Sequence, residues 1–155
     1  MNGVVHAINV SNGGVPKLAR AAAWVDTNGV EGDRQRNLKF HGGPDRAVCL
    51  YSLPLIEALR AEGHPIAPGT AGENLTLDGI DWRGMQPGAR LEIGDLRLEL
   101  TSFTAPCKTI RHSFRDEDFT RISQKVHPGW SRLYARVLDP GRITAGAPAI
   151  LLASP

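Results

Sequence analysis

The sequence predicts a mostly β domain with a few helices, in which short strands form a β-barrel-like sheet. Seventeen glycines and eleven prolines are spread along the 155 residues without a period, as expected of frequent turns between short strands. Seven or more segments have the composition or alternation of strands. These segments do not alternate strictly with helices, as a βαβ architecture would require, and this favours a barrel.

The first half of the chain supplies three predicted strands and a helix. Residues 4–10 and 21–25 are apolar runs that end in turn-forming segments, and residues 47–51 are short, apolar and rich in strand formers. A helix is expected next. Ser52 is suited to cap it, Pro54 lies in the first turn, and Gly63 marks the stop.

The second half is predicted to continue in strands. Residues 90–100 alternate apolar and polar side chains on both sides of Gly94-Asp95, the pattern of a two-residue hairpin. A second helix is expected from Asp116, with Phe119, Ile122 and Val126 on one face. Residues 133–138 and 149–152 look like closing strands. Without a linker or repeat, residues 1–155 are predicted to form a single domain.

Composition excludes several function classes. A formal net charge of +2 argues against a nucleic-acid polymer as partner. No apolar run approaches the length of a membrane span, and the N-terminus lacks the pattern of a signal peptide, so no membrane association is expected. The two cysteines are far apart and have no disulfide-scaffold spacing, which favours a reducing, cytoplasmic location.

Cys107 is the strongest candidate for chemistry. It follows Pro106 at the end of a predicted strand and precedes Lys108, and positive charge close to a thiol favours the reactive thiolate. Cys107 could instead be a small core residue. Cys49 lies inside an apolar strand, where burial is the expected role. A zinc site has little support, whereas a Cys-His dyad with His41 or His112 stays open.

Three further segments could bind a ligand. In the segment from His41 to Arg46, the amides of Gly42 and Gly43 could form an anion-binding nest, and His41 and Arg46 could donate to a phosphate. The alternative is a capped loop with an Asp45–Arg46 pair. Polar groups also occur in two other turns, and taken alone these segments are better explained as plain turns. Their candidate residues are Gly32, Asp33, Arg34, Glu73 and Asn74.

Taken in order, these segments resemble the MOSC family, the domain found at the C-terminus of molybdenum cofactor sulfurases and in stand-alone bacterial proteins. The resemblance covers nearly the whole chain. The matching stretches are residues 29–33, 41–48, 72–75 and 106–107, and a last one at 134–137 with Gly141 and Gly146. One departure is Gly146-Ala147-Pro148, where many relatives have Gly-Asp before the last strand.

The resemblance implies a barrel fold similar to the small barrel domain of pyruvate kinase. It also implies that Cys107 is either a thiolate ligand of molybdenum or a sulfur carrier, and that the molybdenum cofactor is the ligand. The cofactor's phosphate gives His41, Arg46 and the glycine amides a role. Pyridoxal phosphate is not expected, because the aminotransferase-like domain of the fused sulfurases is lacking.

Two functions remain open from the sequence. The chain could bind the cofactor through Cys107, either as an enzyme that reduces N-hydroxylated substrates with electrons from a separate reductase or as a carrier for a client molybdoenzyme. Alternatively, it could be a non-redox barrel that binds a phosphorylated small molecule through His41, Arg46 and the glycine-loop amides.

Overall fold

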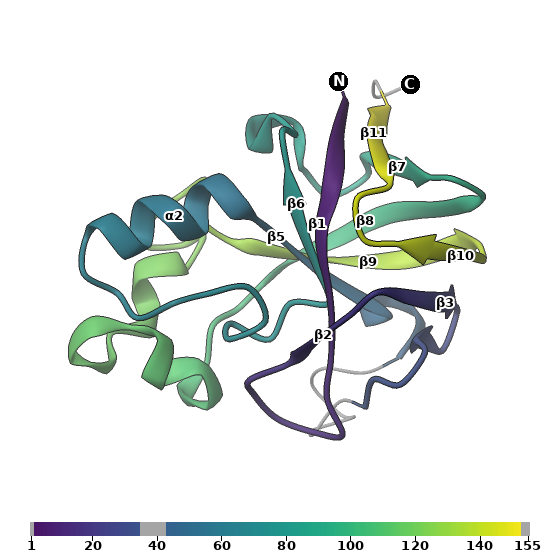
Figure 1. Cartoon of the computed structure of the whole chain (residues 1–155). Coiled ribbons are helices and arrows are strands. Elements are labelled where there is room, and N and C mark those ends of the chain that lie inside the picture. Colours follow the sequence, from purple (N-terminus) through teal and green to yellow (C-terminus); the bar gives the residue numbers. More distant parts are fainter. Residues whose placement is uncertain (1, 35–42, 153–155) are drawn as a thin grey trace.

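Strands make up most of the computed structural model, which describes residues 2–34 and 43–152. Within these ranges the barrel strands are β1 (Asn2–Val10), β5 (Val48–Ser52), β6 (Leu75–Asp78), β7 (Arg90–Ile93), β8 (Leu96–Thr104), β9 (Arg132–Asp139) and β11 (Pro148–Leu152). They pair in the order β11-β7-β8-β9-β5-β6-β1. Pairing of β1 with β11 closes the sheet into a barrel (Figure 1). The predicted fold class is confirmed.

A smaller sheet and an added strand flank the barrel. Strand β2 (Leu18–Arg20) pairs with the end of β1, from Ile8 to Val10. Strands β3 (Ala22–Asp26), β4 (Gly29–Val30) and β10 (Gly141–Thr144) form a three-stranded sheet in the order β10-β3-β4 among the described residues. Strand β10 follows the barrel strand β9 in sequence and pairs with β3, so this sheet joins the N-terminal part of the chain to the C-terminal part.

The predicted helix is confirmed as α2 (Leu53–Ala61), which lies on one side of the barrel (Figure 1). Ser52 caps it, since the Leu55 amide donates to Ser52 Oγ at 3.3 Å. Helix α2 connects β5 to β6, which run parallel, as a crossover connection requires. The hairpin prediction is also confirmed, because Ile93 pairs with Leu96 across Gly94, whose φ is 60°.

The second predicted helix is wrong. From Lys108 onward the chain forms three short 3-10 segments, η3 (Lys108–Ser113), η4 (Arg115–Glu117) and η5 (Phe119–Ile122). Asp116 and Glu117 have φ values of 59° and 57°, in the left-handed region, so an α-helix cannot start there. The apolar pattern still has a role, since Ile122 is buried, whereas Val126 is 56% exposed.

Two apolar clusters position the site. The larger one fills the barrel with side chains such as Leu50, Leu98 and Leu133. The smaller one packs α2 against the 3-10 segments through Ile56, Phe114 and other buried residues. Two more short 3-10 segments, η1 (Pro44–Arg46) and η2 (Trp82–Gly84), lie in barrel loops. No helix in the described ranges has the length and apolarity needed to span a bilayer.

Candidate functional site

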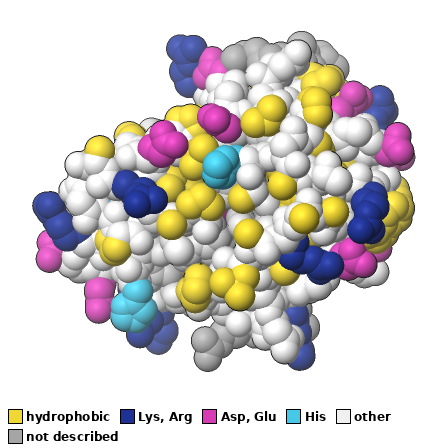
Figure 2. Space-filling model, viewed as in Figure 1, with side chains coloured by type: hydrophobic (Ala, Val, Ile, Leu, Met, Phe, Trp, Pro, Cys, Tyr) yellow, Lys and Arg dark blue, Asp and Glu magenta, His cyan; other side chains and the backbone are white. Residues whose placement is uncertain are grey.

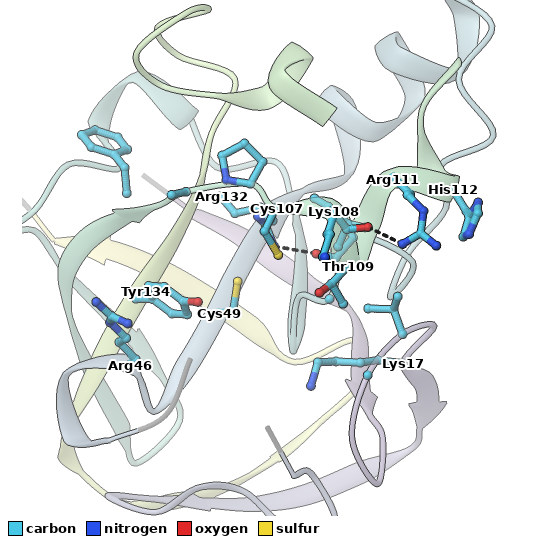
Figure 3. Close-up of a pocket in the computed structure, with 18 of the residues that line it drawn as sticks. Lys17, Arg46, Cys49, Cys107, Lys108, Thr109, Arg111, His112, Arg132 and Tyr134 are labelled. Atoms are coloured by element: carbon cyan, nitrogen blue, oxygen red, sulfur yellow. Dashed lines mark hydrogen bonds between the residues drawn. The ribbon is translucent and has the colours of Figure 1, made fainter. Parts of the chain in front are cut away.

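A pocket of about 1270 Å³ opens on the outer face of the barrel wall, between the loop that follows β8 and the segment before β2 (Figure 3). Its walls come from segments far apart in the sequence. β5 and β9 contribute Cys49 and Tyr134, and the loop after β8 contributes Cys107. Both cysteines of the chain therefore line one pocket.

Cys107 is accessible from this pocket. It is a free cysteine of intermediate burial and stands in extended conformation at the N-terminus of η3, with φ −139°. Cys107 belongs to neither of the two apolar clusters. The following turn is held by Arg111, whose Nη1 donates to the Lys108 carbonyl at 2.9 Å (Figure 3).

The charge of the pocket has one sign. In Figure 2, basic and acidic side chains lie side by side around the margin of the face shown. Among the described pocket-lining residues, in contrast, there are basic side chains and no acidic ones. The basic residues are Lys17, Arg34, Arg46, Lys108, Arg111 and Arg132. Such a lining favours a ligand with negative charge.

The Asp33 carboxylate organises the deep side of the pocket. Its Oδ1 accepts from the Ser11 amide at 2.9 Å and from Lys17 Nζ at 2.6 Å. Its Oδ2 accepts from Asn74 Nδ2 at 2.8 Å, and Asn74 Oδ1 accepts from the Cys49 amide at 3.0 Å. The side chains of Asp33 and Lys17 are only 5% and 4% exposed. Two motifs singled out in the sequence thus meet behind the pocket wall.

Strand β9 supplies two lining residues by simple alternation. Leu133 and Ala135 point into the barrel core, whereas Arg132 and Tyr134 line the pocket. Burial raises the pKa of Tyr134, so its hydroxyl keeps its proton at neutral pH. The Arg46 guanidinium lies over the Tyr134 ring, 5.6 Å from the centroid. Tyr134 therefore brings an aromatic ring and a protonated hydroxyl to the pocket wall.

Glu73 is buried in the wall beside these residues. Its Oε2 accepts from Thr76 Oγ1 at 2.9 Å, and its Oε1 has no hydrogen-bond partner among the described residues. Burial raises the pKa of the Glu73 carboxyl above its ordinary value, because desolvation disfavours the charged form.

The pH dependence of stability follows from this shift. The native state holds the Glu73 proton at pH values where the unfolded chain, with a pKa of about 4.3, has released it. The contribution of protonated Glu73 to the free energy of unfolding is complete below about pH 4.3. It is lost as the pH rises through the pKa that Glu73 has in the folded state. Urea unfolding from about pH 4 to about pH 8 should show the free energy of unfolding falling in the wild type relative to Glu73→Gln.

Glu117→Gln, which removes an exposed carboxyl, is the control for the general loss of one negative charge. A difference between wild type and Glu73→Gln that stays constant across the pH range would contradict the prediction.

The residues predicted from the sequence fall into three groups. Cys107, Lys108, Arg34 and Arg46 line the pocket. The second group, which does not appear in the described lining, comprises Gly32, Asp33, Gly43, Glu73 and Asn74. His41 and Gly42 lie outside the described residues.

Sequence reasoning missed Lys17, Arg132 and Tyr134 as lining residues, and it assigned Cys49 only to the interior. Cys49 is 3% exposed, as predicted, and burial raises its pKa, yet its side chain borders the pocket. Alternation along the predicted strand 133–138 could have indicated that Tyr134 and Arg132 share its outer face. Nothing local in the sequence distinguishes Lys17.

Comparison with known proteins gives consistent results. The profile of the MOSC domain matches residues 37–149. The uncharacterized protein YflK of Bacillus subtilis is 29% identical over 146 residues, which is 92% of this chain and 64% of YflK. Protein YiiM of Escherichia coli is 31% identical over 129 residues, 80% of this chain and 56% of YiiM. The chain thus spans less than two thirds of the length of these two curated relatives.

Solved structures show the same fold. A crystal structure of a hypothetical protein superposes with a TM-score of 0.77 at 26% identity, over 99% of this chain and 69% of that chain. YiiM from Escherichia coli superposes with a TM-score of 0.74 at 24% identity, over 99% of this chain and 70% of that chain. YiiM from Geobacillus stearothermophilus superposes with a TM-score of 0.73 at 23% identity, over 97% of this chain and 75% of that chain.

Proposed function

The chain belongs to the MOSC domain family, and from this membership we propose that it binds the molybdenum cofactor in the cationic pocket with Cys107 as the protein's thiolate ligand. The family is associated with binding of this cofactor. The observation that carries the proposal is the placement of a partly exposed thiol in the same pocket as six basic side chains.

The residues present fit such a group. Thiolate is a soft ligand and suits a thiol-rich molybdenum centre. Arginine and lysine side chains suit the phosphate of the pterin part, and the described lining holds no carboxylate to repel it. Arg34, Arg46 and Lys108, which were predicted from the sequence, are among the basic residues that line the pocket, together with Tyr134.

The cofactor, when bound, supplies a metal that exchanges electrons. The role of the protein is to position it: Cys107 anchors the metal end, and the basic side chains hold the anionic part. As an enzyme, the protein would reduce N-hydroxylated substrates to amines and water with two electrons from a separate reductase and two protons. As a carrier, the Cys107 thiolate would accept a sulfane sulfur from the persulfide of a sulfur donor, which is left as a thiolate, and would deliver this sulfur or the cofactor to a client molybdoenzyme. The free thiols Cys49 and Cys107 suit a cytoplasmic location.

The test is metal analysis of the protein purified from a host fed with molybdate. About one molybdenum per chain, together with reduction of an N-hydroxylamine in the presence of an electron donor, supports the enzyme. Sulfane sulfur on Cys107 without turnover supports the carrier. Protein with neither molybdenum nor sulfane sulfur contradicts both forms of the proposal.

The second candidate is a non-redox barrel that binds a phosphorylated small molecule through Arg46, His41 and the glycine-loop amides. The single sign of the pocket's charge supports it as well, because it requires only an anionic ligand. Phosphate-ligand binding and activity that are the same in Cys107→Ser as in the wild type would favour this candidate over the molybdenum proposal.

A further inference from the structure

Arg132 is a buried cation in the pocket wall with an unused hydrogen-bond donor. The residue is 5% exposed and lines the pocket. Its Nη1 donates to the Ala71 carbonyl at 2.7 Å, whereas its Nε has no partner among the described residues. No carboxylate in residues 2–34 and 43–152 lies within ion-pair distance of it.

This arrangement costs free energy unless something pairs with the charge. A guanidinium stays protonated at all physiological pH values, so Arg132 cannot become neutral on burial. Removing a charge from water is unfavourable unless it is paired and hydrogen-bonded. Lys17, the other deeply buried cation of the pocket, shows the usual solution, because Asp33 lies 2.6 Å from its Nζ. No carboxylate in the described part of the chain forms such an ion pair with Arg132. The Arg132 charge lowers the pKa of the buried Glu73 carboxyl, but desolvation has the larger effect and favours the neutral form of that carboxyl.

We propose that Arg132 binds the anionic group of the pocket's ligand, and that this group is a doubly charged tetrahedral oxyanion of the phosphate type. Guanidinium donors match the oxygens of such a group in fork geometry. Of the six basic side chains in the described lining, Lys17 is paired with Asp33 and Arg111 with Glu117, and the remaining four still exceed the charge of a single negative group. This inference deepens the proposed function, and it depends on that function only for the identity of the rest of the ligand.

The inference also orients the ligand. Arg132 and Lys17 lie on the deep side of the pocket, whereas Arg46 is on a short turn before β5. The anionic end therefore enters first and is held by the barrel wall. This differs from the sequence-based expectation, which assigned the phosphate to Arg46 and the loop before it.

The test uses inorganic phosphate and, in parallel, a nucleoside monophosphate, titrated into the purified full chain by calorimetry. Arg132→Met is expected to weaken binding of phosphate by about tenfold to hundredfold, the equivalent of losing a charged hydrogen-bond partner. Arg136→Met is the matched control: it lies on the same strand face, is half-exposed and does not line the pocket. Arg136→Met should bind phosphate with the same affinity as the wild type.

Two further measurements distinguish anion binding by Arg132 from a purely structural role of this residue. Arg132→Lys keeps the charge but loses the fork, and it should bind phosphate with an affinity between those of wild type and Arg132→Met. At equal phosphate concentration, the melting temperature of the wild type and of Arg136→Met should rise more than that of Arg132→Met. Equal phosphate affinity in wild type and Arg132→Met, or no saturable binding of either probe to the wild type, overturns the inference.

The two proposals fail separately in this design. If Cys107→Ser binds phosphate normally and the wild type contains no molybdenum, the molybdenum proposal fails and the anion site stands. Tighter binding of the monophosphate than of phosphate identifies the anion as part of a larger ligand. Tighter binding of phosphate identifies a free oxyanion.

Discussion

A Cys107→Ser variant is expected to lose molybdenum to background when it is purified from the same molybdate-fed host as the wild type. A serine hydroxyl is a hard donor and does not replace a thiolate on a soft metal centre. Substitution of groups that only support a metal ligand already costs about 10–100-fold in affinity, so loss of the ligand itself should cost at least as much. Molybdenum per chain, measured by mass spectrometry, checks the prediction.

Cys49→Ser is the matched control, because Cys49 borders the same pocket but is buried in β5. It should retain molybdenum and lose about 0.5–3 kcal/mol of stability through altered packing. Cys107 should also react readily with a thiol reagent in the native protein, and Cys49 slowly. If molybdenum persists in Cys107→Ser but disappears in Cys49→Ser, the metal ligand is the buried Cys49 and the proposal for Cys107 is wrong.

An Asp33→Ala variant is expected to lose about 3–5 kcal/mol in the free energy of unfolding, because it leaves Lys17 buried without its counter-ion. The same change removes the acceptor of the Ser11 amide and of the Asn74 side chain. Urea or thermal unfolding of the purified variant measures the loss. The loop that carries Lys17 into the pocket should loosen with it.

Asp139→Ala is the control for this prediction. Asp139 is 60% exposed and lies 3.9 Å from Arg97, so its removal should cost less than about 1 kcal/mol. A loss in Asp33→Ala no larger than that in Asp139→Ala would show that the buried ion pair does not support the site.

Much of the fold could be predicted because its signals are local. Alternation in residues 90–100 and a glycine-first turn specify the hairpin of β7 and β8, and Ser52 with Pro54 specify the start of α2. The helix predicted from Asp116 failed for a non-local reason. Phe119 and Ile122 pack in the cluster that includes α2 without forming a helix, and the backbone at Asp116 and Glu117 adopts left-handed conformations that local propensity does not anticipate.

The candidate site was predictable only where a residue is unusual in its own segment. Cys107 stands out beside Pro106 and basic neighbours, and the structure places it in the pocket. Asp33 and Asn74 stand out as motifs, but their hydrogen bond to each other, at 2.8 Å, joins residues 41 positions apart. Arg132 and Lys17 carry no local signal at all.

By itself, therefore, the sequence determined the barrel class and the family and singled out Cys107 as the candidate thiol, since these depend on periodicity, turn residues and motif order. Only the tertiary structure decided which basic side chains surround that thiol and which of the two buried ones lacks a counter-ion. The physical reason is that burial and charge pairing are properties of groups brought together across the chain. Lys17 is neutralised by Asp33 and Arg132 is not, and this difference exists only once β1, β6 and β9 are in place.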